Sequence, residues 1–229
     1  MGQLNGSEIL AKALKREGVD ELFFLMGGPM LAAESASIKE GIRCIDVRHE
    51  QAAAMMAQAY SRLQQRPGVC MAASGPATIN LSTGLANALI DCCPVVALGG
   101  ASPILGNGKQ VFQEIDQMEI MSGCVKYAAR VHDAHRIPEL LNTAMQRAMS
   151  GKPGPVYLDL PGDVLYQMVD EEKVDWALSG RSILGSRPPA DEVQIEALVQ
   201  VLKKAERPVI LSGSGIIWSQ AWEELHALV

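Results

Sequence analysis

The sequence has few aromatic residues. It also has no cluster of basic residues and no long apolar run, and each of these two absences argues against a class of protein. Lys and Arg number 20 against 26 Asp and Glu, for a net charge of −6. The negative net charge and the absence of a basic run argue against nucleic acid or an anionic membrane surface as a partner. No apolar stretch reaches the roughly 18–20 residues of a membrane span. With 48% hydrophobic residues, the chain is too apolar for a disordered protein, and a globular fold is expected.

The cysteines and the N-terminal residues point to a reducing compartment. The five cysteines contain no C-x-x-C pair. Cys44 and Cys70 lie in runs that predict strands, where a free thiol packs as a small hydrophobe. The first residues lack the basic start and apolar run of a signal peptide. We therefore expect a reduced, cytoplasmic protein.

Helical and strand patterns alternate from residue 6 to about residue 163. The predicted strands cover 21–25, 42–47, 69–73, 95–98, 126–131 and 156–160. The predicted helices cover 7–17 with Ser7 as the cap, a segment ending at 39, 50–65, 79–90, a segment before 126, and 138–149. Runs such as 69–73 are apolar without alternation, which is typical of strands buried on both faces. The alternation predicts an α/β fold with a doubly wound, mostly parallel sheet and helices on both faces.

The pattern divides the chain into three parts. Residues 1–165 form one α/β domain, and 166–190 are first charged and then rich in Gly and Pro, which indicates a linker. Residues 191–229 predict a helix, a strand at 209–211 and a further helix. A unit this short, with one strand, rarely folds alone without a metal or disulfide, so we expect the beginning of a second α/β domain, truncated.

Ligands of open α/β sheets bind beyond the carboxyl ends of the strands. The loops at these ends contain Gly27-Gly28-Pro29, Arg48-His49-Glu50-Gln51, the segment 74–80 and the segment 99–113. Glu50 is either a first-turn acid that favours the helix dipole or a partly buried group that meets a ligand. Likewise, Gly27 and Gly28 fit a tight turn, and Asn80 fits a helix start. Spacing alone leaves these alternatives open.

The order of four motifs carries a resemblance to a known family. They are Gly-Gly at 27–28, Arg-His-Glu-Gln-Ala-Ala at 48–53, Ser-Gly-Pro-x-x-x-Asn at 74–80 and Phe-Gln-Glu at 112–114. This resembles the N-terminal, pyrimidine-binding domain of thiamine diphosphate (ThDP)-dependent enzymes. The relevant branch contains acetolactate synthase, benzaldehyde lyase, 2-hydroxyacyl-CoA lyase and oxalyl-CoA decarboxylase. The resemblance extends over the whole chain and includes 66–69, 151–156, 158–161 and 204–210, the last similar to the start of the family's central domain.

The resemblance implies roles for individual residues. Glu50 matches the carboxyl group that shares a proton with N1′ of the cofactor's pyrimidine and so helps the 4′-amino group to take the C2 proton. Phe112 and Gln113 match the pair that contacts the reacting donor, with Gln113 a catalytic hydrogen-bond donor. The remaining matched residues are expected to line the pyrimidine pocket: Gly27, Gly28, Pro76 and Asn80.

Some positions depart from the family pattern. Met26 stands where many acetolactate synthases have a proline and benzaldehyde lyase has a catalytic histidine. A thioether cannot shuttle protons, which argues against direct benzaldehyde-lyase chemistry and leaves Met26 as a substrate-lining residue. Pro29 resembles the acyl-CoA branch. The Ser-Gly-Ser-Gly segment at 212–215 lacks the third glycine of a dinucleotide fingerprint, because Trp218 occupies it. Binding of FAD, of CoA or ADP, or of nothing by the central domain therefore stays open.

The implied function is that of acetolactate synthase, in which the ThDP ylide decarboxylates a 2-keto acid and the product adds to a second carbonyl. The alternatives are a 2-hydroxyacyl-CoA lyase, oxalyl-CoA decarboxylase or benzaldehyde-lyase-like C–C lyase, and a non-catalytic chain that pairs with a separate subunit. The family binds Mg²⁺ and the diphosphate through a Gly-Asp-Gly…Asn segment absent from these residues. No metal ligand is therefore expected here, and the fragment alone should be inactive. The family's site lies between subunits, which implies a homodimer or tetramer.

Overall fold

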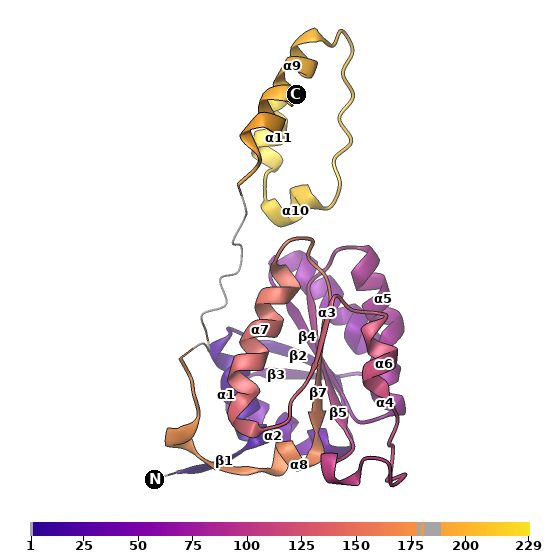
Figure 1. Ribbon diagram of the computed structural model, residues 1–229, viewed down its shortest axis with the longest axis vertical. Coiled ribbons are helices and arrows are strands. Elements are labelled where there is room, and N and C mark those ends of the chain that lie inside the picture. Colours follow the sequence, from indigo (N-terminus) through magenta and orange to yellow (C-terminus); the bar gives the residue numbers. More distant parts are fainter. Residues whose placement is uncertain (1, 178–179, 181–188) are drawn as a thin grey trace.

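A six-stranded parallel sheet forms the main body of the computed structural model, which describes residues 2–177, 180 and 189–229 (Figure 1). The strand order is β3-β2-β4-β5-β7-β6, and every neighbouring pair is parallel. The strands are β2 (Glu21–Leu25), β3 (Arg43–Asp46), β4 (Gly68–Ala72), β5 (Val95–Ala101), β6 (Tyr127–Arg130) and β7 (Val156–Pro161). The predicted α/β fold is confirmed.

Helices cover both faces of this sheet (Figure 1). One face carries α1 (Gly6–Arg16), α2 (Leu31–Lys39) and α7 (Ile137–Met149). The other face carries α3 (Glu50–Gln64), α5 (Ser82–Ile90) and α6 (Gln117–Ser122). Short helices follow two strand ends, α4 (Pro76–Ile79) after β4 and α8 (Gly162–Tyr166) after β7. Single 3-10 turns cover Gly28–Met30, Ile104–Gly106, Ala134–Arg136 and Glu171–Lys173.

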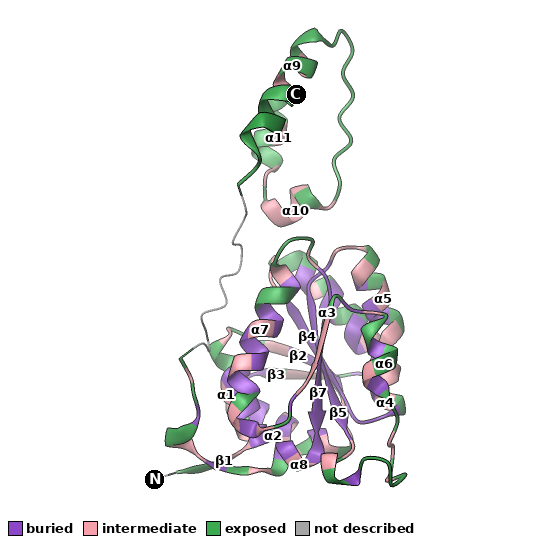
Figure 2. Ribbon diagram, in the orientation of Figure 1, coloured by how far each residue is buried: buried purple, intermediate pink, exposed green. Residues whose placement is uncertain are grey.

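The two faces have separate hydrophobic cores, because successive strand residues point to opposite sides of the sheet. On β2, Leu22 and Phe24 join the core under α1 and α7, whereas Phe23 joins the core under α3 and α5. The central strands β4, β5 and β7 are buried throughout (Figure 2). Burial on both faces explains why these strands have apolar runs without alternation.

Two local predictions were wrong. The cap of α1 is Asn5 instead of Ser7: Asn5 and Glu8 form a reciprocal capping box, while the buried Ser7 hydroxyl donates to the Leu165 carbonyl at 3.2 Å. The helix expected over 79–90 is interrupted between α4 and α5. There the N–H of Leu81 bonds to the carbonyl of Thr78, three residues back, which tightens the chain into a turn.

A second, two-stranded sheet was not predicted. β1 (Gln3–Asn5) pairs antiparallel with β8 (Met168–Asp170). The end of α8 and the whole of β8 therefore lie in the segment expected to be a linker. Residues 178–179 and 181–188 of that segment lie outside the described residues.

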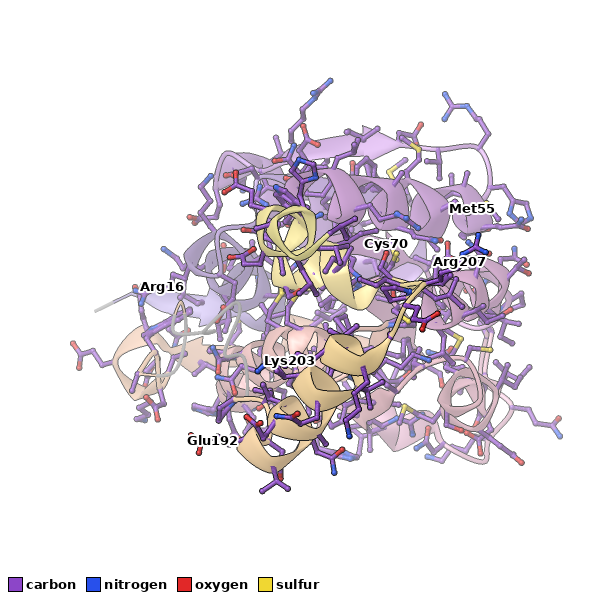
Figure 3. The ribbon with its side chains drawn as sticks, turned by 90° about the horizontal axis from the view of Figure 1, so that it is seen from above. Arg16, Met55, Cys70, Glu192, Lys203 and Arg207 are labelled. Atoms are coloured by element: carbon purple, nitrogen blue, oxygen red, sulfur yellow. The ribbon has the colours of Figure 1, made fainter. Side chains whose placement is uncertain are left out.

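The C-terminal segment contains α9 (Glu192–Lys204), α10 (Gly215–Ser219) and α11 (Trp222–Leu228), and none of these helices has a buried residue (Figure 2). In Figure 3, Glu192 is the first residue of α9, Lys203 lies in its last turn, and Arg207 lies in the coil that follows. The strand predicted at 209–211 is wrong, since these residues are coil with Val209 84% and Leu211 94% exposed. A strand forms only against a partner, and no described strand pairs with this run.

None of the helices in the described ranges is long and apolar enough to cross a membrane.

Candidate functional site

The candidate site lies at the carboxyl edge of the sheet, where the strand order reverses. The chain leaves β2 for β3 on one side and continues with β4 on the other, so the loops after β2 and β4 flank the switch point, the usual ligand crevice of such sheets. Gly28 has φ +50°, and a Cβ there would lie 3.5 Å from Ser74 Oγ. A Cβ at Gly27 would lie 3.1 Å from the Ala73 side chain. The two glycines therefore let the β2 loop approach the β4 loop closely.

Glu50 and Asn80 meet at the same edge. Glu50 is the first residue of α3 and is 7% exposed, and the helix N-terminus stabilises a carboxylate there. The Asn80 side chain donates a hydrogen bond to Glu50 Oε2 at 2.9 Å. Asn80 is the C-cap of α4, so the turn between α4 and α5 places its side chain next to Glu50. His49 caps the helix: its Nδ1 accepts from the Gln51 N–H at 3.2 Å.

Gln113 lies against the turn that follows β4. Its side-chain oxygen accepts a hydrogen bond from Ser74 Oγ at 2.7 Å. Its backbone has φ +58°, which is uncommon for a residue with a side chain. The neighbouring Phe112 is 84% exposed. Phe112 lines a cavity of about 480 Å³ together with Gly28, Pro29, Ser74, Ala101, Ser102, Pro103, Val111, Gly162, Asp163 and Tyr166. Gln113 is linked to this cavity through its bond to Ser74.

The structure gathers most of the predicted residues into two groups, Glu50 with Asn80 and Gln113 with Gly28. Met26, directly after β2, is 59% exposed. Pro76 is the first residue of α4 and is also exposed. These two residues are open to a ligand but have no partner in either group.

Sequence reasoning missed a buried polar network behind the site. Gln117, at the start of α6, and Tyr157 and Asp159, on β7, are each at most 1% exposed. Asp159 Oδ1 accepts from the Tyr157 hydroxyl at 2.6 Å and lies 2.6 Å from the Gln117 amide nitrogen. Its other oxygen accepts from Arg130 Nε. Burial, reinforced by Asp159, raises the pKa of Tyr157 well above its ordinary range. The sequence signal for this network is Asp159, a carboxylate inside the otherwise apolar strand β7.

Cys44 and Cys70 lie within the strands β3 and β4. Burial raises the pKa of Cys70 to about 12 and that of Cys44 to about 11, so both thiols stay protonated and unreactive at neutral pH. Within the described residues, no group of three or more His, Cys, Asp or Glu side chains could hold a metal ion.

A glycine turn and a buried carboxylate at the switch point of a parallel sheet define a ligand-binding α/β domain. Residues 4–120 match the family model "Thiamine pyrophosphate enzyme, N-terminal TPP binding domain". The chain belongs to this family, whose cofactor is ThDP under its other name.

Curated relatives extend the match beyond this domain. A 2-hydroxyacyl-CoA lyase of Arabidopsis thaliana is 34% identical in an alignment 229 positions long, which covers 99% of this chain and 40% of that protein. A probable acetolactate synthase large subunit of Methanocaldococcus jannaschii is 38% identical in an alignment 228 positions long, which covers 98% of this chain and 38% of that protein. The large subunit of acetolactate synthase isozyme 2 of Escherichia coli is 34% identical over 220 residues, with coverages of 95% and 39%. The chain therefore spans about two fifths of the length of these relatives.

Proposed function

We propose that this chain supplies the pyrimidine-binding half of a ThDP-dependent active site, in an enzyme that decarboxylates a 2-keto acid and joins the product to a second carbonyl, as acetolactate synthase does. The observation that carries the proposal is the pairing of Glu50 with Asn80. A largely buried carboxyl group is held on one oxygen at the switch point of the sheet, where ligands of this fold class bind.

The residues present fit an aminopyrimidine. Gly27 and Gly28 form a turn whose backbone approaches Ala73 and Ser74, and a side chain at either glycine would reduce the space beside them. Such a turn allows a flat ring to lie directly against the backbone. Pro76 adds an exposed apolar surface at the start of α4. Glu50 supplies the acid that an aromatic ring nitrogen needs for a shared proton.

The chemistry divides between the cofactor and this chain. When bound, ThDP supplies a nucleophilic thiazolium carbon, activated by its own 4′-amino group. Glu50 holds the proton that the pyrimidine nitrogen shares, and Asn80 fixes the orientation of the carboxyl group through Oε2. Phe112, which lines the cavity, and Gln113, bonded to the cavity-lining Ser74, contact the donor substrate, Gln113 through its side-chain amide. Met26 lines the approach to the glycine turn.

A second candidate is a C–C lyase such as 2-hydroxyacyl-CoA lyase or oxalyl-CoA decarboxylase. Two observations favour it: the 34% identity to a 2-hydroxyacyl-CoA lyase over 229 residues, and Pro29 in the wall of the cavity of about 480 Å³. A pocket of that volume accepts ligands much larger than a short keto acid. Met26 still argues against the benzaldehyde-lyase variant. A third candidate, from another class, is a non-catalytic chain that pairs with a separate subunit.

The remaining assignments follow from the family. Residues 1–165 are the pyrimidine-binding domain, and 191–229 are the beginning of the central domain. The segment 166–190 connects them, and its first part packs on the pyrimidine-binding domain through β8. The Gly-Asp-Gly…Asn segment through which the family binds Mg²⁺ and the diphosphate does not occur among these 229 residues, and the site forms between subunits of a cytoplasmic homodimer or tetramer. Bound FAD belongs to the central domain where it occurs, and flavin absorbance of the purified holoenzyme tests for it.

An assay of the holoenzyme with pyruvate, ThDP and Mg²⁺ tests the proposal. Acetolactate is the expected product, whereas CO2 with free aldehyde would indicate a decarboxylase. Cleavage of a 2-hydroxyacyl-CoA to an aldehyde, without acetolactate formation, would select the lyase. If neither substrate reacts although ThDP binds, the chain is a non-catalytic partner.

A further inference from the structure

The buried polar network and the candidate substrate-contacting residue Gln113 are connected through one turn. The Gln117 side-chain oxygen accepts from the Gly75 N–H at 2.9 Å, and its amide nitrogen lies 2.8 Å from the Gly100 carbonyl. The same nitrogen lies 2.6 Å from Asp159. Gln117 thus joins the ends of three neighbouring strands: the turn after β4, the end of β5, and β7.

The turn after β4 contacts Gln113 directly. Gly75 has φ +59°, and a Cβ there would lie 2.4 Å from the Gln113 carbonyl oxygen. Ser74, which is 4% exposed, donates its hydroxyl proton to Gln113 Oε1 at 2.7 Å. Because this bond occupies the oxygen of the carboxamide, the amide nitrogen is the end left to donate to a substrate.

From these contacts, we propose that Ser74 and Gln117 are positioning residues for Gln113. Ser74 fixes which end of the Gln113 carboxamide is presented, and Gln117 holds the Gly75 turn on which Ser74 depends. Asp159 keeps Gln117 in place, and Tyr157 and Arg130 keep Asp159 in place. This inference rests on the proposed function, in which Gln113 contacts the donor substrate.

The backbone of Gln113 shows why such support is needed. A residue with a side chain at φ +58° is in a sparsely populated backbone region and is held there by its surroundings. The turn at Gly75 packs against its carbonyl, and Gln117 follows four residues later on the same segment. Loss of either support lets Gln113 relax, and a displacement of about 1 Å is enough to reduce turnover strongly.

A double-mutant cycle on the holoenzyme tests this inference. The variants are Ser74→Ala, Gln113→Ala and the double variant, with Gln117→Met as a second, independent arm. We expect Ser74→Ala and Gln117→Met each to lower kcat/KM by about tenfold in the parent. Neither should lower it by more than about twofold when Gln113 is already alanine, because contacts that act through one residue are not additive. Ser74→Thr, which keeps the hydroxyl group, should restore most of the activity.

The control is Asn142→Ala, a substitution of an equally buried polar residue on α7 that bonds to Glu17 on the opposite face. It should lower kcat/KM equally little with and without Gln113. Additive losses for both Ser74→Ala and Gln117→Met would overturn the inference and indicate a merely structural role. If Gln113→Ala itself leaves kcat/KM unchanged, the failure lies in the proposed role of Gln113.

Discussion

Two buried carboxylates, Glu50 and Asp159, differ in how fully they are bonded. Asp159 is 0% exposed, and three side chains bond to its two oxygens. Glu50 is 7% exposed, and Asn80 is its one side-chain partner in the part of the chain that the structure describes. A fully bonded buried carboxylate is typical of a structural role. A buried carboxylate with spare bonding capacity, at a ligand-binding edge, is typical of a functional one.

The two carboxylates also differ in their source of positive charge. Arg130 contacts Asp159 as a full cation, whereas the partial charge of the α3 N-terminus stabilises Glu50. The Arg130 guanidinium and two further donors occupy the oxygens of Asp159. Glu50 has one side-chain donor, Asn80, among the described residues and therefore has bonding capacity left for a ligand. The comparison therefore predicts that substitutions of Glu50 act on activity alone, whereas substitutions of Asp159 act first on stability and reach activity only through Gln117.

The largest effect is expected from Glu50→Gln in the holoenzyme. An amide cannot share the proton that activates the cofactor, so C2–H exchange of bound ThDP should slow by about two to four orders of magnitude. Hydrogen–deuterium exchange followed by NMR measures this rate. Glu139→Gln, which changes a first-turn acid of α7 far from the site, should leave exchange unchanged. An unaltered exchange rate in Glu50→Gln would show that Glu50 does not take part in activating the cofactor.

Asp159→Ala should have the second largest effect, this time on folding. Its loss leaves Arg130, Tyr157 and Gln117 without their common acceptor. We expect the free energy of unfolding to fall by about 3 kcal/mol. The loss stays at this level because Arg130 is 25% exposed, so water replaces part of its bond to Asp159. Urea denaturation of the chain measures the loss. Asp133→Ala, which changes a half-exposed carboxylate, should cost much less. A loss below about 1 kcal/mol would show that the network is not a stabilising unit.

Asn80→Ala should have a smaller effect on activity than Glu50→Gln. Asn80 is exposed, so water can take its place at Glu50 Oε2, and we expect C2–H exchange to slow by about tenfold. Asn80→Asp places a second carboxylate opposite Glu50 and should slow exchange further than Asn80→Ala does. If Asp behaves like Ala at this position, the contact with Glu50 does not form in the holoenzyme.

The smallest effect concerns Tyr157, whose pKa is raised by burial and by Asp159. The folded protein keeps the phenol proton above about pH 10, where the unfolded chain releases it. Stability contributed by this group is therefore complete below pH 10 and falls as the pH rises, by up to about 1.4 kcal/mol per unit. Tyr157→Phe should cost about 1 kcal/mol at neutral pH. That deficit should shrink above pH 10 in urea denaturation series, and a constant deficit would contradict the assignment.

Elements with strong local signals were predictable from the sequence. The strand expected at 21–25 is β2, and the helix expected to start at Glu50 is α3. Both follow from apolar periodicity and helix-start residues, which act within a few residues. β1 and β8 were missed because three-residue strands carry little pattern. The run 209–211 has strand-like residues, but β propensity acts only with a pairing partner.

The candidate site was predictable in part for the same reason. Glu50, Asn80 and the Gly27-Gly28 turn follow the carboxyl ends of strands, where open α/β sheets bind their ligands. Gln117, Tyr157 and Asp159 were missed because Gln117 is about 40 positions from the two β7 residues that it contacts. Only the register of β5 with β7 and the placement of α6 bring these groups together. Ser74 was likewise recognised as part of a turn, without its contact to Gln113.

The pairing of β1 with β8 has a consequence for synthesis. Gln3 lies opposite Asp170, so β1 leaves the ribosome long before β8 and stays unpaired until all six strands of the parallel sheet have been translated. The two-stranded sheet forms only after β8 has been translated and pairs with β1. A chain stalled before β8 would expose an unpaired strand edge, the feature through which folding intermediates associate.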